Sequence, residues 1–165
     1  MKRIAFAFAL CAVVAAGGLA AEKKTPERKD PNAIGVDIRL FKYLVEEQYQ
    51  SAFGFNPEQT KAYWYTNGVG EVAVKIPLAG TYEIQIRASG DSALNERAKF
   101  KVGFGGEAVG GETTLRTDDI ADYAFKVKAK SGEQKLTIEF TNDERKEGEY
   151  DRNLYIHEVT LKRVR

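Results

Sequence analysis

The sequence predicts an all-β protein, an antiparallel β-sandwich of jelly-roll type, and three observations lead to this prediction. From Gly70 onward, apolar and polar residues alternate with a period of two in one segment after another. Turns rich in Gly, Pro, Ser and Asp separate these segments. Seven or more short strands with one apolar face each are typical of two sheets packed face to face, although the pattern also allows a barrel.

The alternating segments follow one another between residues 72 and 140, with turns at 77–80, 89–91, 105–106 and 130–133. Within each segment the apolar residues share one face, and we expect these faces to form the core between the sheets. The predicted inward residues are Val72, Val74 and Ile76; Tyr82, Ile84, Ile86 and Ala88; Ala98, Phe100, Val102 and Phe104; Tyr123, Phe125 and Val127; and Leu136, Ile138 and Phe140.

The start of the chain has the features of a secretory signal peptide over residues 1–21, with a basic start, an apolar run and small residues at the cleavage site. Residues 22–33 are predicted to be a charged, proline-containing linker. Residues 34–165 are then one β-sandwich domain. We expect it to be exported to the periplasm, the cell surface or the medium, to be monomeric, and to stay out of the membrane once the signal is removed.

The segment 34–55 allows two interpretations. Ile38, Phe41, Leu44 and Val45 fit a helical stripe, whereas residues 40–45 fit a strand equally well. A strand with a short helix is the favoured interpretation.

Charge and cysteine content exclude some function classes. The chain has 25 Lys and Arg against 24 Asp and Glu, a net charge of +1, so it lacks the basic excess that binding to a phosphate backbone requires. The one cysteine, Cys11, lies in the predicted signal peptide, so the exported domain has no disulfide. We therefore expect no nucleic-acid partner, and a domain held by its core with the help of a metal.

The polar segment from Asn142 to Asn153 connects two predicted strands and could hold that metal. If residues 151–153 are extended, the side chains of Asp151 and Asn153 lie on one side, and loop closure returns Asp143 to them. Carboxylate and amide oxygens are the ligands that calcium prefers, and the chain has a single His, which argues against zinc. The alternative is a solvated loop in which Asp143 and Asp151 cap local turns.

Residues 140–143 read FTND and residues 151–156 read DRNLYI, and both segments resemble the terminal motif of calcium-dependent, xylan-binding carbohydrate-binding modules of families 36 and 60. The resemblance extends over about residues 62–164 and includes WYTNG, AGTY, RASGD and FKV in the same order. It implies a jelly-roll module in which a loop-bound calcium ion keeps positions open for vicinal sugar hydroxyls. It also implies Asp143, Asp151 and Asn153 as ligands, with Asn142 and Asp91 as second-rank candidates.

Aromatic residues near the loop would provide the stacking surface for a sugar ring. The family often has an aromatic residue just after the FTND segment, whereas this chain has Glu144-Arg145-Lys146, which leaves Tyr150 in the loop. Trp64 is the second candidate, and packing at a sheet end is its alternative role. We therefore expect weak sugar binding.

Two further motifs are given structural interpretations. His157 is expected to share a strand face with Tyr155, Val159 and Leu161 as a core or rim histidine. The stretch Gly103–Ala108 formally matches a dinucleotide-binding pattern, but two more glycines follow instead of a helix, so a hairpin turn is predicted there.

The sequence thus predicts a non-catalytic module that binds polysaccharide of the xylan or galactan type with calcium as cofactor. The alternative is a structural or protein-interaction sandwich that keeps the calcium loop without binding sugar. An enzyme is not expected, because glycoside hydrolysis requires a second carboxylate placed in a cleft and the sequence offers no convincing candidate.

Overall fold

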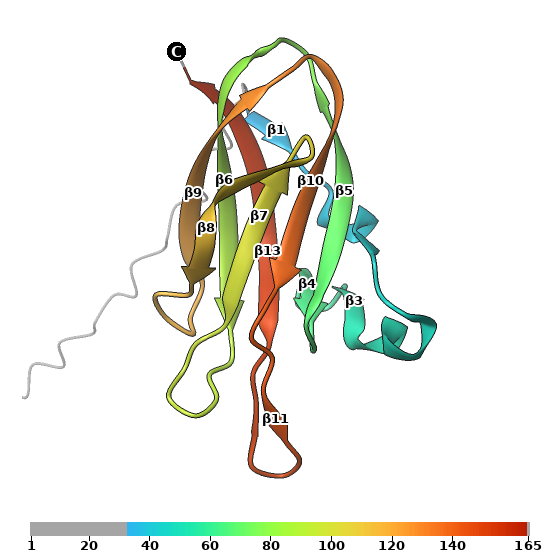
Figure 1. Cartoon of the computed structure of the whole chain (residues 1–165), viewed down its shortest axis with the longest axis vertical. Helices are drawn as coiled ribbons and strands as arrows, with labels where there is room; N and C mark the ends of the chain where they lie inside the picture. The colour runs from blue at the N-terminus through green and yellow to red at the C-terminus, as the bar shows by residue number, and fades with distance from the viewer. Residues whose placement is uncertain (1–32, 165) are drawn as a thin grey trace, which may run out of the picture.

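The computed structural model describes residues 33–164, which form two antiparallel sheets packed face to face (Figure 1). The β-sandwich predicted from the sequence is therefore confirmed. The predicted signal peptide and residues 22–32 of the predicted linker lie outside the described residues, while Ala33, the last residue of that linker, begins the first strand. Across residues 33–164 there is no helix long and apolar enough to cross a bilayer.

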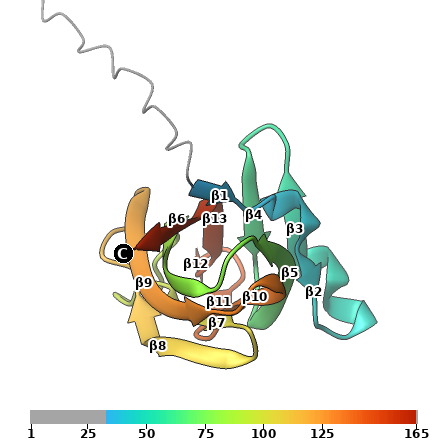
Figure 2. The same cartoon turned by 90° about the horizontal axis from the view of Figure 1, so that it is seen from above.

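One sheet has the strand order β3-β4-β13-β6-β9, with β1 pairing on β13, and the other has the order β2-β5-β10-β7-β8. Figure 2 shows the two sheets as layers seen from above. The elements are β1 (Ala33–Gly35), the 3₁₀ helix η1 (Ile38–Leu40), β2 (Lys42–Tyr43), the 3₁₀ helix η2 (Glu47–Ala52), β3 (Phe53–Asn56), β4 (Lys61–Trp64), β5 (Gly68–Ile76), β6 (Gly80–Gly90), β7 (Lys99–Phe104), β8 (Glu107–Thr114), β9 (Ala121–Ala129), β10 (Gly132–Phe140), β11 (Arg145–Lys146), β12 (Tyr150–Asp151) and β13 (Leu154–Val164).

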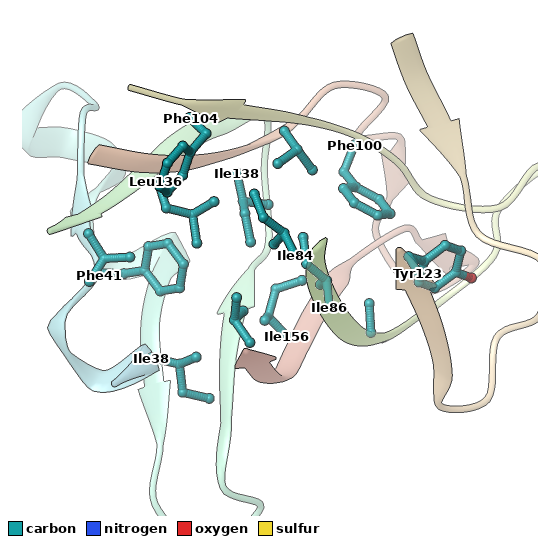
Figure 3. Packing of buried hydrophobic residues seen from close by; sticks show 14 of the residues in the cluster. Ile38, Phe41, Ile84, Ile86, Phe100, Phe104, Tyr123, Leu136, Ile138 and Ile156 are labelled. Carbon is teal, nitrogen blue, oxygen red and sulfur yellow. The ribbon is translucent and has the colours of Figure 1, made fainter. Parts of the chain in front are cut away.

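The core lies between the sheets and contains the residues that the period-two alternation predicts. Figure 3 shows Ile84 and Ile86 of one sheet packed near Leu136 and Ile138 of the other, and all four side chains are fully buried. Every residue predicted to point inward is buried, apart from Phe125, which is partly buried against the same cluster. The alternation of apolar residues therefore specifies both the strands and the side of each strand that faces the core.

Strand β13 departs from simple alternation at His157. Its register with β6 shifts between Ile156 and Glu158, which is a β-bulge that adds one residue to β13. Ile156 is buried before the bulge and Val159 after it, while His157 is only partly buried. The prediction of one common face for His157 and Val159 is therefore wrong, because the extra residue switches the faces along the strand.

The segment between β1 and β4 consists of short strands and 3₁₀ turns, which agrees with the favoured interpretation and excludes one continuous helix. Ile38 and Phe41 are buried, whereas Leu44 is 58% exposed, so the helical stripe does not form. The predicted hairpin turn at Gly105 and Gly106 is confirmed: both residues have positive φ, +62° and +91°, in the tight turn between β7 and β8.

Candidate metal and sugar site

Three loops meet at the end of the sandwich opposite the C-terminal end of β13 (Figure 1). They are residues 65–67 after β4, residues 91–98 after β6 and residues 141–153 between β10 and β13. Within the last loop, β11 and β12 form a small hairpin that extends beyond the sheets (Figure 1). The polar segment predicted as one loop is therefore a loop with a short hairpin inside it.

Arg152 ties two of these loops together. Its side chain is only 4% exposed, and its guanidinium donates to the carbonyl of Ala93 at 2.6 Å, to that of Glu96 at 3.1 Å, and to that of Asn142. Three carbonyls on two loops are thereby satisfied by one buried cation, whose hydrogen bonds are charge-assisted. Nothing in the sequence distinguishes this arginine from the exposed charges around it, so its burial was not predicted.

Asp143 lies at the base of the hairpin, and its backbone N–H donates to Oδ1 of Asn67 at 2.7 Å. Its Oδ1 is buried and has no hydrogen-bond partner. Burial raises the pKa of this carboxyl, a hydrogen bond with Thr66 opposes that shift, and the nearby charge of Asp151 adds to it. The site thus contains a carboxylate that is costly to ionise without a cation.

Asn153 also has a buried side-chain oxygen without a partner. The residue is 6% exposed, its Nδ2 donates to Oδ2 of Asp91 at 3.0 Å, and its Oδ1 is unsatisfied. The backbone N–H of Arg152 donates to the carbonyl of Glu144 at 3.0 Å, so the segment carrying Asn153 runs beside the segment carrying Asp143. Both unsatisfied oxygens therefore come from neighbouring chain segments of one loop.

These residues fit a calcium ion. Asp151, the third predicted ligand, is exposed on β12, and its charge is close enough to affect the pKa of Asp143. No three His, Cys, Asp or Glu side chains gather closely enough to hold a metal by themselves in the part of the chain described here. A calcium site does not require three such side chains, because calcium also accepts amide and backbone carbonyl oxygens. Asp143, Asp151 and Asn153 offer two carboxylates and one amide. A cation is a partner of the kind that each of the two buried oxygens lacks.

The two second-rank ligand candidates have other roles in the structure. Asn142 uses both ends of its amide on the neighbouring loop: its Oδ1 accepts from the backbone N–H of Lys99 at 2.7 Å and its Nδ2 donates to the carbonyl of Arg97 at 3.0 Å. Asp91 accepts two hydrogen bonds on Oδ2, from Asn153 and from the hydroxyl of Tyr155 at 2.6 Å. Unlike Oδ1 of Asp143 and of Asn153, the accepting oxygens of Asn142 and Asp91 thus have hydrogen-bond partners on the protein, so both residues stay second-rank candidates, with Asp91 behind Asn153.

Trp64 does not stack on a ligand, which corrects the expectation from the sequence. Its side chain is 0% exposed and packs edge-on against Phe41 and Tyr43, with ring centroids 5.4 and 5.3 Å apart. Alternation along β4 places Tyr63 and Tyr65 on the opposite side, where their rings stack at 4.5 Å and Tyr65 is 40% exposed. The same alternation, read from the sequence, would have identified Tyr65 as the outward aromatic residue.

Tyr65 extends an aromatic surface toward the loop end. Its ring meets that of Tyr155 edge-on at 6.3 Å, and the ammonium of Lys61 lies 3.3 Å from the Tyr155 ring centroid. Burial, together with the charges of Tyr63, Asp91 and Asp151, raises the pKa of the Tyr65 hydroxyl. Tyr150 is partly buried on β12, opposite Lys146. Tyr65, Tyr150 and Tyr155 are thus aromatic residues near Asp151, and of these Tyr65 is the exposed one.

A hollow of about 340 Å³ lies on the outer face of the sheet that contains β5, β10 and β7, away from the loop end. Four of the charged residues that line it or lie beside it form two ion pairs: Lys101 with Glu139 at 3.9 Å, and Lys135 with Glu71 at 3.0 Å. Its one aromatic lining residue, Phe104, is 5% exposed. This hollow offers no ring for a sugar and no unsatisfied ligand, so the loop end is the better candidate.

Comparison with known proteins identifies a matching family. The family model of the Ca-dependent, xylan-binding carbohydrate-binding module CBM60 matches residues 83–165, which include all three predicted ligands. No match was found among curated proteins.

Solved structures show the same fold. A CBM36-1 domain of a multidomain xylanase from the hindgut metagenome of Trinervitermes trinervoides is 17% identical, with a TM-score of 0.60, over 81% of this chain and 99% of that chain. The GH26-CBM35 β-(1,4)-mannanase of Podospora anserina is 11% identical, with a TM-score of 0.58, over 81% of this chain and 28% of that chain. The apo CBM1 of BiXyn10A is 17% identical, with a TM-score of 0.55, over 79% of this chain and 92% of that chain.

Proposed function

Since the chain belongs to the Ca-dependent, xylan-binding carbohydrate-binding modules of family CBM60, we propose that it binds a xylan- or galactan-type polysaccharide through calcium held at the loop end of the sandwich. The observation that carries the proposal is the pair of buried oxygens without partners, Asp143 Oδ1 and Asn153 Oδ1. Buried polar atoms are rarely left unsatisfied in folded proteins, so this pair needs a partner from outside the chain.

Asp143, Asp151 and Asn153 are the residues that hold the ion in this proposal. Two carboxylates and one amide provide fewer oxygens than the six to eight that calcium takes. When bound, calcium supplies open coordination positions that two adjacent sugar hydroxyls can fill. Asp151 is exposed, so the protein leaves that side of the site accessible to a chain from solution.

The aromatic surface beside the loops provides the second part of the binding site. Tyr65 is the exposed ring directly after β4 and Tyr150 is the ring on the hairpin, and either can pack against the C–H face of a sugar. With one or two rings and few direct hydrogen bonds, we expect a dissociation constant between about 10 μM and 1 mM, or about −7 to −4 kcal/mol.

We also propose that the module is non-catalytic. In this proposal Asp143 and Asp151 hold the metal, and Asp91 accepts two hydrogen bonds from its neighbours, so none of these three is free to act as acid or nucleophile. The other carboxylates of the 141–153 loop, Glu144, Glu147 and Glu149, are exposed to solvent. Export, as predicted from residues 1–21, would place the domain where polysaccharides occur.

The experiment that tests the proposal measures unfolding and glycan binding, each with millimolar calcium and with chelator. At a hundredfold excess over its dissociation constant, calcium should stabilise the protein by about 2.7 kcal/mol, and the melting temperature should rise by about 5 to 10 °C. Binding to xylan or galactan should disappear in chelator and persist in moderate salt. An unchanged melting curve would exclude the metal site, and stabilisation without binding to any glycan would favour a structural role.

Asp151→Ala identifies the ligands within that experiment. The variant should lose most of the calcium-dependent stabilisation while its melting temperature in chelator stays near that of the wild type, because an exposed carboxylate contributes little to the core. Asp119→Ala, at an exposed aspartate in the loop between β8 and β9, is the matched control. A normal calcium response in Asp151→Ala would show that the ligand assignment is wrong.

A further inference from the structure

Asp91 contacts Asn153 through both its backbone and its side chain. The backbone N–H of Asp91 donates to the carbonyl of Asn153 at 3.1 Å, and Oδ2 of Asp91 accepts from Nδ2 of Asn153 at 3.0 Å. A Cβ atom on the preceding residue, Gly90, would lie 2.5 Å from that same carbonyl oxygen. The end of β6 therefore packs directly against Asn153, and glycine is required for this close approach.

This contact selects one orientation of the Asn153 amide. A side-chain amide presents an oxygen at one end and an N–H donor group at the other, and a carboxylate can only accept hydrogen bonds. If the amide were turned around, its oxygen would face the Asp91 carboxylate, which is unfavourable in a buried position. Asp91 therefore holds the nitrogen, and Oδ1 of Asn153 is left buried and unsatisfied on the other side.

Tyr155 holds the Asp91 carboxylate in turn. Its hydroxyl donates to the same oxygen, Oδ2, at 2.6 Å, and the Lys61 ammonium packs over its ring. With two donors on Oδ2, the carboxylate is fixed toward β13. Three residues from β4, β13 and the loop after β6 thus determine where one amide oxygen points.

We propose that Asp91 is a positioning residue that orients the Asn153 amide so that its oxygen, and not its nitrogen, faces the calcium ion. This inference rests on the proposed function, because it assigns a role within the same metal site. In this role Asp91 is not a calcium ligand, and it contributes to calcium binding through its hydrogen bond to Nδ2 of Asn153. The carboxylate also polarises the amide it holds, which strengthens the amide oxygen as a ligand.

The test is a calcium titration of Asp91→Ala by calorimetry, alongside the wild type. Loss of a partner that orients a metal ligand typically weakens metal affinity by about 10- to 100-fold, and we expect a decrease in that range. Asp91→Asn should bind calcium more tightly than Asp91→Ala, because an asparagine can turn its own oxygen toward Nδ2 of Asn153. The Asp91→Asn variant also tests the inference if Asp91→Ala does not fold. Unfolding in chelator separates the metal effect from a general loss of stability.

A double-mutant cycle with Asn153→Ala distinguishes positioning from direct ligation. If Asp91 acts through Asn153, adding Asp91→Ala to Asn153→Ala should change the calcium affinity by no more than about threefold. If Asp91 is itself a ligand, the two effects should multiply, and that result would overturn the inference. Full affinity in Asp91→Ala, with a wild type that binds calcium, would overturn it as well. A wild type that binds no calcium would instead refute the proposed function, and this inference with it.

Discussion

The space between the two sheets and the loop end of the same sandwich are both buried, but by different means. Between the sheets, side chains such as Ile84 and Ile138 are fully buried and apolar, and each is surrounded by others of the same kind. At the loop end, Arg152 and Asn153 are almost as inaccessible, yet they are polar and depend on a few hydrogen bonds. Among the described residues, the core leaves one buried donor without a partner, Nε1 of Trp64, whereas the loop end leaves two buried oxygens unsatisfied, those of Asp143 and Asn153.

This difference indicates how stability and function are divided in the molecule. Apolar burial is non-directional, so the core tolerates small shifts and stabilises the fold whether or not a ligand is bound. Buried polar groups have fixed geometry and a large penalty when unpaired, so the loop end can be arranged around a ligand only because the sheets hold its three loops in place. Substitutions in the core should therefore change stability and leave calcium affinity unchanged, whereas substitutions at the loop end should change calcium or sugar binding.

The largest effect on stability is expected for Ile138→Ala in the core. Ile138 is 0% exposed, and such truncations cost about 2 to 5 kcal/mol because they lose transfer free energy and leave a cavity. The calcium affinity of the folded variant should equal that of the wild type. Urea unfolding in chelator, followed by calcium titration, measures both. A weakened calcium site in this variant would show that the two regions are not independent.

Arg152→Ala should affect stability and the metal site together. It leaves the carbonyls of Ala93, Glu96 and Asn142 without their donor, and we expect a loss of about 2 to 3 kcal/mol in the free energy of unfolding. Calcium affinity should also fall, because the loops that carry Asp91 and Asn153 lose the buried guanidinium that joins them and keep only their remaining hydrogen bonds. Arg152→Lys, which keeps the charge but not the planar fork of donors, should be intermediate. Equal free energies of unfolding for wild type and Arg152→Ala would disprove the role of Arg152 in joining the two loops.

Tyr65→Ala should affect sugar binding alone. Loss of one stacking ring should weaken glycan affinity by about tenfold, or about 1.4 kcal/mol, while the calcium-dependent rise in melting temperature stays unchanged. The control is Tyr49→Ala, a tyrosine that is 50% exposed on η2, away from the loops. Isothermal titration with a xylan oligosaccharide in calcium compares the two variants, and equal affinities would place the sugar elsewhere.

The smallest effect concerns His157, which lies between the two regions and whose Nε2 is 2.8 Å from Oγ of Ser89. Burial, followed by the charges of Lys61 and Arg87, lowers the pKa of His157 below its ordinary value of 6.5. The unfolded chain therefore binds a proton more readily, and the stability that is present above pH 6.5 is lost as the pH falls through the lowered pKa. His157→Gln should lose less stability than the wild type between pH 6.5 and 5, as measured by urea unfolding. If the free energy of unfolding of both proteins falls equally between pH 6.5 and 5, the prediction is wrong.

Part of the candidate site follows from the sequence in the same way as the fold. The segments FTND and DRNLYI identify the loop, and Asp143, Asp151 and Asn153 come from it as predicted ligands. Arg152 is in the middle of the second segment, yet its burial is invisible in the sequence, because it depends on carbonyls of a loop more than fifty residues away. Contacts between distant segments are set by how the sheets pack and not by local pattern.

By itself, the sequence determined the long strands that line the core, their inward faces and the fold class, because period-two alternation is a local property that each of these strands carries in its own residues. It did not predict β8, where that alternation is absent. Tertiary structure alone decided where that alternation is interrupted, as at the bulge at His157, and which polar side chains lie inside, as with Arg152. It also decided that Asp91 meets Asn153, since that contact forms only when the end of β6 is held against β13. A polar group acquires its role from its partners, and those partners come from segments that only the folded sheets bring together.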